Sequence, residues 1–119
     1  MWEFLANAAA AGTVPCDVRK ELFGGTGEVR VWALLGPVVP PFDCVLACEL
    51  SPGGSVGKHV QDTCSEVLIF LEGSGQVTVA DMTGVMTPSA TVAIPQGETL
   101  SIKNTGSVPL RYLIVKAKP

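Results

Sequence analysis

A regular succession of short apolar or alternating segments, bounded by Gly, Pro, Asn, Asp or Ser, constrains the fold of this chain more than any other feature. Alternation of apolar and polar residues indicates strands, and Gly and Pro clusters mark the turns between them. The pattern predicts about eight or nine short strands, which is typical of an all-β sandwich or a small closed barrel. The segments expected to form strands are residues 17–23, 27–36, 42–50, 56–61, 66–72, 75–81, 90–95, 99–104 and 109–117.

Length and composition indicate a single globular domain over residues 1–119. With 119 residues, of which 47% are hydrophobic and 16% charged, the chain can bury a core and is too apolar to be disordered. No repeat, linker or low-complexity stretch divides it. The alanine-rich start, "MWEFLANAAAAG", predicts a short helix or arm over residues 1–13, because Ala favours helix and Gly12 can end it.

Charge and apolar patterning exclude several functions. The net charge is −3 and no Lys/Arg cluster is present, so we expect no nucleic-acid partner. The longest apolar stretches fall far short of the roughly 20 residues that cross a membrane. An acid stands near the start, where a secretion signal needs a basic residue. A cytoplasmic location is therefore expected.

The chain is apolar for a domain that stands alone, with a mean hydropathy of +0.39. In the strand predicted over residues 66–72, Leu68 and Phe70 occupy one face, and Val67 and Ile69 occupy the other. Both faces of such a strand are expected to be covered. The outer apolar face is most commonly buried against a second copy of the same chain, so the sequence predicts a homodimer.

The four cysteines are expected to be small buried thiols in a reducing compartment. Cys44 and Cys48 would point to one face of a strand, with Cα atoms about 13 Å apart. A disulfide requires Cα atoms within about 7 Å, and the spacing is not that of a zinc site. Cys16 and Cys64 are isolated, although polar site candidates flank Cys64 on both sides.

The single histidine, His59, stands on a predicted strand close to two other polar residues. Residues two apart on a strand share a face, so His59 and Gln61 are expected to point into the same space. A turn at "DTCS" would send the chain back antiparallel, with Glu66 facing that space. A buried carboxylate needs a partner, so we expect a hydrogen-bonded His59–Glu66 pair. Both residues are then candidate catalytic groups for acid–base chemistry.

These residues resemble the first of the two paired motifs of the cupin superfamily. In that motif a glycine is followed by His-x-His, then by a glutamate and a second glycine. The corresponding positions here are Gly53, His59, Gln61, Glu66 and Gly73. Gln61 stands where the family has its second histidine.

The stretch "PQGETLSIKN" resembles the second cupin motif. Pro95, Gly97 and Asn104 match that motif. Ser89 replaces the leading glycine, and Leu100 replaces the histidine. Two motifs that agree in their internal and mutual spacing make the resemblance to small single-domain cupins specific.

The resemblance implies both a fold and a site. It covers residues 45–115, the expected conserved barrel core, and implies a cupin-type antiparallel β-barrel, also called a double-stranded β-helix or jelly roll. It also implies that His59, Gln61 and Glu66 occupy metal-ligand positions, whereas Leu100 leaves the fourth position apolar. An amide oxygen is a weaker donor than imidazole, so the expected cofactor is at most a weakly held divalent ion such as zinc, iron, manganese or nickel.

The expected ligand pocket combines polar and apolar side chains, namely His59, Gln61, Glu66, Leu100, Leu68 and Phe70. Three classes of function stay open, and the sequence does not decide whether the protein is an enzyme. The favoured class is a small cupin that binds a small organic ligand in its barrel with little or no metal. The alternatives are a metal-dependent dioxygenase or isomerase using His59, Gln61 and Glu66, and a degenerate barrel that serves as an oligomerising scaffold. Metal analysis and ligand-induced stabilisation separate these classes.

Overall fold

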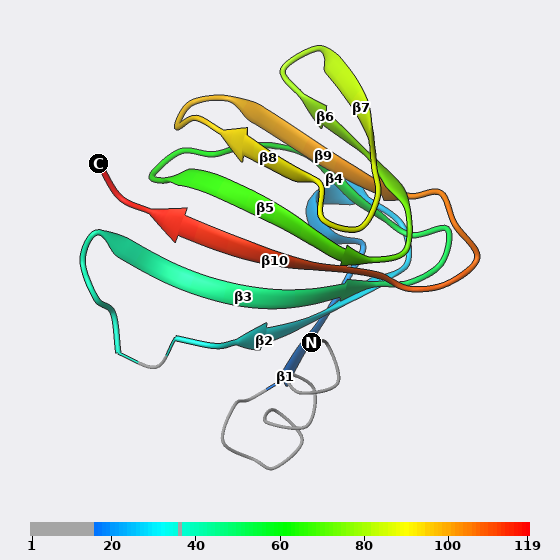
Figure 1. Cartoon of the computed structure of the whole chain (residues 1–119), viewed down its shortest axis with the longest axis horizontal. Helices are drawn as coiled ribbons and strands as arrows, with labels where there is room; N and C mark the ends of the chain where they lie inside the picture. Colours follow the sequence, from blue (N-terminus) through cyan, green and yellow to red (C-terminus); the bar gives the residue numbers. More distant parts are fainter. Residues whose placement is uncertain (1–15, 36) are drawn as a thin grey trace.

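The computed structural model describes residues 16–35 and 37–119, and within these ranges the chain is almost entirely β-structure (Figure 1). No helix in these ranges is long and apolar enough to cross a membrane. The helix or arm predicted over residues 1–13 lies outside the described residues. The elements are β1 (Cys16–Lys20), the 3-10 turn η2 (Leu22–Gly24), β2 (Glu28–Ala33), β3 (Phe42–Leu50), β4 (Ser55–Val60), β5 (Ser65–Glu72), β6 (Gly75–Val79), β7 (Met82–Met86), β8 (Thr91–Ile94), β9 (Thr99–Asn104) and β10 (Leu110–Ala117).

The strands form two antiparallel sheets that enclose the core. One sheet has the order β1-β2-β3-β10-β5-β8, and the other has the order β4-β9-β6-β7. The first sheet therefore joins strands from both ends of the chain, because β10 is inserted between β3 and β5. This architecture confirms the all-β jelly-roll barrel predicted from the sequence.

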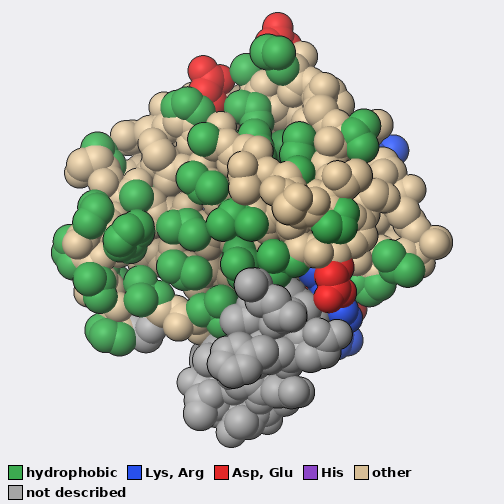
Figure 2. All heavy atoms as spheres, in the orientation of Figure 1, with side chains coloured by type: hydrophobic (Ala, Val, Ile, Leu, Met, Phe, Trp, Pro, Cys, Tyr) green, Lys and Arg blue, Asp and Glu red, His purple; other side chains and the backbone are tan. Residues whose placement is uncertain are grey.

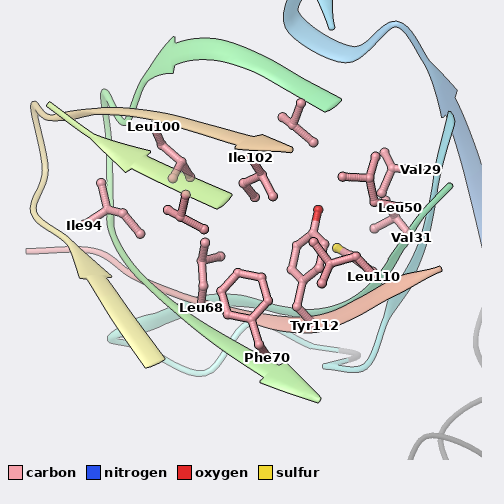
Figure 3. Close-up of a cluster of buried hydrophobic side chains, with 13 residues drawn as sticks. Val29, Val31, Leu50, Leu68, Phe70, Ile94, Leu100, Ile102, Leu110 and Tyr112 are labelled. Carbon is pink, nitrogen blue, oxygen red and sulfur yellow. The ribbon is translucent and has the colours of Figure 1, made fainter. Parts of the chain in front are cut away.

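The core consists of the side chains that each strand turns inward, as the alternation along the strands predicted. Phe70 and Tyr112 are at most 1% exposed, and their rings lie with centroids 5.5 Å apart. Figure 3 shows the cluster between the two sheets. It contains Val29, Val31, Leu50, Leu68, Phe70, Ile94, Leu100, Ile102, Leu110 and Tyr112.

Two strand predictions differ from the structure. The strand β7 was not expected, because "MTGVM" contains a central glycine and no clear alternation. It pairs with β6 through a tight hairpin in which Ala80 has φ 55°, and the hydroxyl groups of Thr78 and Thr83 lie 2.9 Å apart. The strand predicted over residues 17–23 already ends at Lys20, because the chain then turns through left-handed conformations.

All four cysteines are free thiols, as expected. Cys48 and Cys64 are buried as predicted, but the prediction is wrong for Cys16, which is exposed on the edge strand β1, and for Cys44, which is half-buried. Burial raises the pKa of the Cys48 thiol to about 12, so this thiol is neutral at physiological pH. Cys48 therefore serves as a small apolar core residue.

Candidate ligand-binding site

The backbone around His59 is fixed by strand pairing and by a turn of the second motif. His59 on β4 lies directly opposite Leu100 on β9, next to a register shift that starts at Val56. After β4 ends, the amide of Gln61 donates to the carbonyl of Glu98 at 3.0 Å. The amide of Gly97 in turn donates to the carbonyl of Gln61 at 2.7 Å. The two sequence motifs are thus joined by main-chain hydrogen bonds.

Both ring nitrogens of His59 are engaged within the protein. Nδ1 lies 2.8 Å from the carbonyl oxygen of Gly57, and because a carbonyl only accepts, Nδ1 carries the proton. Nε2 is then an acceptor, and it receives a hydrogen bond from the side-chain amide of Gln61 at 3.1 Å. Burial lowers the pKa of His59 below its ordinary value, and the charge of Lys116 acts in the same direction. This lowered pKa favours the neutral imidazole at neutral pH.

An aromatic ring from a distant turn covers His59. The ring of Phe23 in η2 stacks on the imidazole, with centroids 3.9 Å apart and an angle of 13° between the planes. Phe23 has φ 53° and ψ 34°, a left-handed conformation that is costly for a bulky residue. The turn approaches β4 closely because Gly25 and Gly57 lack side chains. A Cβ atom on Gly57 would overlap the carbonyl of Phe23, and one on Gly25 would overlap the carbonyl of Ser55.

Glu66 is the second residue of β5, and its carboxyl group is buried. Its side chain is 3% exposed, and its register partners are Lys116 on β10 and Ile94 on β8. Within the described chain, Oε2 of Glu66 has no hydrogen-bond partner. Burial raises the pKa of Glu66, and Lys116 opposes this shift. An unpaired buried acceptor lowers the free energy of unfolding. A group that donates a hydrogen bond to Oε2 would offset this cost.

The predicted hydrogen bond between His59 and Glu66 is not formed. The two nitrogens of His59 bond instead to Gly57 and Gln61, which leaves no position for the carboxyl group. Local main-chain geometry at the end of β4 explains the difference, since both partners lie two residues from His59 in the sequence.

A cavity of about 80 Å³ lies next to Glu66. Three residues expected at the site, His59, Glu66 and Leu100, line this cavity. The other three residues expected in the pocket do not line it: Gln61 is hydrogen-bonded to His59, and Leu68 and Phe70 belong to the buried core cluster (Figure 3). The other lining residues are Arg19, Leu22, Phe23, Val29, Val31, Leu46, Cys48, Val56, Ile102, Tyr112, Ile114 and Lys116.

The sequence did not point to several residues that line the cavity. Phe23 and Arg19 come from the N-terminal third, where no motif marks them. Lys116 carries a weak signal, because it shares a strand face with Tyr112 and Ile114, both of which point inward. Alternation along "PLRYLIVKA" is the one signal in the sequence that could have indicated Lys116.

The residues present do not fit a resident divalent metal. A metal bound to His59 needs the lone pair of Nε2, which the amide of Gln61 already occupies. Leu100, directly opposite His59, offers no donor atom. In residues 16–35 and 37–119, no three His, Cys, Asp or Glu side chains are grouped so that they could hold a metal ion.

Fold and site together define a small jelly-roll barrel with one half-buried histidine, one buried carboxyl group and a largely apolar cavity. The profile of the family described as "Cupin domain" matches residues 46–116. This match covers more than half of the chain, and the chain therefore belongs to the cupin family.

Relatives and solved structures agree with this assignment. The chain is 31% identical over 90 residues to a mannose-1-phosphate guanylyltransferase of Klebsiella pneumoniae, a match that covers 74% of the chain but only 19% of that relative. A predicted oxalate decarboxylase of Thermotoga maritima is similar in structure, with TM-score 0.84, 25% identity, and coverage of 91% of this chain and 96% of the other. A Cupin 2 conserved barrel domain protein of Salinispora arenicola has TM-score 0.67 and 22% identity, with 76% of each chain covered.

Replacing Glu66 by leucine is expected to stabilise the protein at neutral pH by about 1–3 kcal/mol, because the unpaired acceptor is removed. The folded-state pKa of Glu66 lies above the ordinary value of 4.5, so the folded state binds the proton more tightly than the unfolded chain. The contribution of Glu66 to stability is therefore fully present below pH 4.5 and is lost as the pH rises through the folded-state pKa. Urea unfolding of both proteins across this pH range measures the effect.

The control for this prediction is Glu98→Leu, at an exposed glutamate. It should change the free energy of unfolding little and show no pH-dependent gain. A Glu66→Leu variant that is less stable than the parent at neutral pH would show that Glu66 has a stabilising partner.

Proposed function

We propose that this cupin domain binds a small organic molecule inside its barrel without a resident metal. The observation that carries the proposal is Oε2 of Glu66, a buried acceptor with no partner among the described residues, at the wall of a largely apolar cavity. Buried polar groups are normally hydrogen-bonded, so a ligand that donates to Oε2 would complete the site. Few precisely placed polar groups in an apolar cavity are typical of small-molecule sites.

The metal-dependent enzyme is the weaker alternative. A metal-dependent enzyme would require the hydrogen bond between His59 and Gln61 to break, so that Nε2 could bind a metal. Leu100, opposite His59, has no atom that could serve as a further metal ligand. The named activities of the relatives do not decide the matter, since the chain spans 19% of the guanylyltransferase. An oligomerising scaffold without a ligand would leave the cost of the unpaired Glu66 unexplained.

Ligand binding is expected to appear as a rise in melting temperature in a screen of small organic molecules. A compound at about 100 times its Kd stabilises the folded state by about 2.7 kcal/mol. For a domain of this size that corresponds to a rise in Tm of roughly 10 °C. Val31→Phe places a larger side chain on the cavity wall and should abolish the rise, whereas Leu68→Met, in the packed core, should keep it. A screen in which no compound stabilises the parent, or stabilises both variants equally, would count against the proposal.

The outer face of the six-stranded sheet is the proposed contact with a second copy of the chain. Val67 lies opposite Val115, and Ile69 lies opposite Leu113, on the face turned away from the core. Val67 is 39% exposed. Figure 2 shows hydrophobic side chains gathered over the region that β3, β10 and β5 occupy in Figure 1. An apolar sheet face of this kind is suited to a twofold interface between identical sheets.

Light scattering at micromolar concentration is expected to give twice the chain mass of 12.4 kDa. Val67→Glu should shift the protein to the monomer, because it places a charge on the apolar face. The matched control is Val85→Glu on β7, where the valine is 69% exposed on the other sheet. A parent protein that elutes and scatters as a monomer would contradict the dimer.

A further inference from the structure

We infer that the ligand of this cavity is a short 2-hydroxycarboxylate, whose hydroxyl group donates to Oε2 of Glu66 and whose carboxylate binds the ammonium group of Lys116. The inference rests on the proposed function, because it names the chemical class of the molecule bound at the same site. It follows from three properties of the cavity: a missing donor, an available cation and a small volume.

The missing donor is defined by Glu66. Oε2 is buried and has no hydrogen-bond partner in the described part of the chain. His59 cannot supply the bond, since its proton is donated to Gly57 and its other nitrogen accepts from Gln61. A ligand that carries its own O–H or N–H group would supply this bond.

The available cation is Lys116. It lines the same cavity and is the register partner of Glu66 on the neighbouring strand, so the two side chains leave the sheet on the same face. No carboxylate of the described residues lies within 4.0 Å of its ammonium group. Arg19, the second cation of the lining, is already bound to Asp17 at 2.9 Å. A ligand that places an anionic acceptor beside its donor would satisfy Lys116 and Glu66 together.

The volume of about 80 Å³ limits the ligand to a few heavy atoms. One water molecule occupies about 30 Å³ in the liquid, so the cavity has room for a body of roughly two to four carbon atoms. Aliphatic walls formed by Val31, Leu100 and Ile102 favour an alkyl end over a second charged group.

Other small molecules fit the three properties less well. A simple carboxylate such as propionate leaves Oε2 of Glu66 without a donor. A neutral amide or diol leaves Lys116 without an anion. An amine places a cation beside Lys116 and Arg19, and like charges in a partly buried site repel.

The test compares lactate with propionate, lactamide and 1-amino-2-propanol by NMR titration of the full chain. Lactate is expected to bind at least about tenfold more tightly than each of the others, since each lacks one of the two polar contacts. Propionate lacks the hydroxyl group, and lactamide lacks the negative charge. 1-Amino-2-propanol has a positive charge in place of the negative charge.

Variants assign each contact to its residue. Glu66→Leu should bind lactate and propionate equally, because the acceptor for the hydroxyl group is gone. Glu66→Gln keeps an acceptor oxygen and should keep part of the preference. Lys116→Met should bind lactate and lactamide equally, whereas Lys103→Met, at an exposed lysine, should behave as the parent.

Each outcome separates this inference from the proposed function. If compounds of another class bind and are lost in Val31→Phe, the cavity is a ligand site but the assignment to hydroxycarboxylates is wrong. If lactate keeps its preference in Glu66→Leu or Lys116→Met, the assigned contacts are wrong. If neither these probes nor any compound of the screen binds, the proposed function fails as well.

Discussion

The double variant Gln61→His/Leu100→His is expected to hold about one equivalent of zinc or nickel through dialysis against a weak chelator, whereas the parent loses it. Replacing Gln61 removes the amide that occupies Nε2 of His59 and supplies a second imidazole on the same side. Leu100 lies directly opposite His59 on the neighbouring strand, so a histidine there adds a third imidazole. With Glu66, the four side chains form a donor set suited to zinc, nickel or iron. Metal content after dialysis is the measurement, with melting temperature followed in parallel.

The control for the metal site is Gln61→His/Ile102→His. It also introduces two imidazoles, one at position 61 and one on β9, but Ile102 lies opposite Val56 and not opposite His59. This control should bind no more tightly than the Gln61→His single variant. Retention of one equivalent by the parent would overturn the metal-free proposal. Equal binding by the double variant and the parent would show that positions 61 and 100 do not surround His59.

Gly57→Ala is expected to be the most destabilising single substitution near the site, with a loss of about 1–3 kcal/mol or more. A Cβ atom at this position would overlap the backbone carbonyl of Phe23, and backbone cannot move aside as a side-chain end can. The turn η2 must then lift from β4, which separates the Phe23 ring from His59. Urea unfolding measures the loss, and the side-chain NMR signals of His59 report the loss of the stacked ring.

The matched control for this glycine is Gly84→Ala on β7. A Cβ atom there meets the end of the flexible Met86 side chain at 3.0 Å and no backbone atom. The free energy of unfolding should change by less than about 0.5 kcal/mol. A Gly57→Ala protein as stable as the parent, with unchanged His59 signals, would show that η2 does not rest on β4.

Most of the barrel and part of the site follow from local patterns in the sequence. Glu66 alternates with Leu68 and Phe70, so its inward position was predictable before any tertiary contact was known. The same rule placed His59 at the site, whereas Leu100 was placed there by its position in the second cupin motif. It missed β7, because the short hairpin strand "MTGVM" forms through pairing with β6 and has no pattern of its own.

Alternation along the strands did not predict which groups the inward-facing side chains contact. The sequence suggested Glu66 as the partner of His59, but main-chain geometry at the end of β4 brought Gly57 and Gln61 to the ring instead. Phe23 reaches His59 from a turn far away in the sequence.

Which side chains point inward was determined by the sequence itself, because alternation is a property of each strand alone. Which inward groups meet was decided only by the tertiary structure. The position of Glu66 at the cavity depends on β10 lying between β3 and β5, which also brings Lys116 beside Glu66. These neighbours come from distant segments, and their register is set by the closure of the whole barrel.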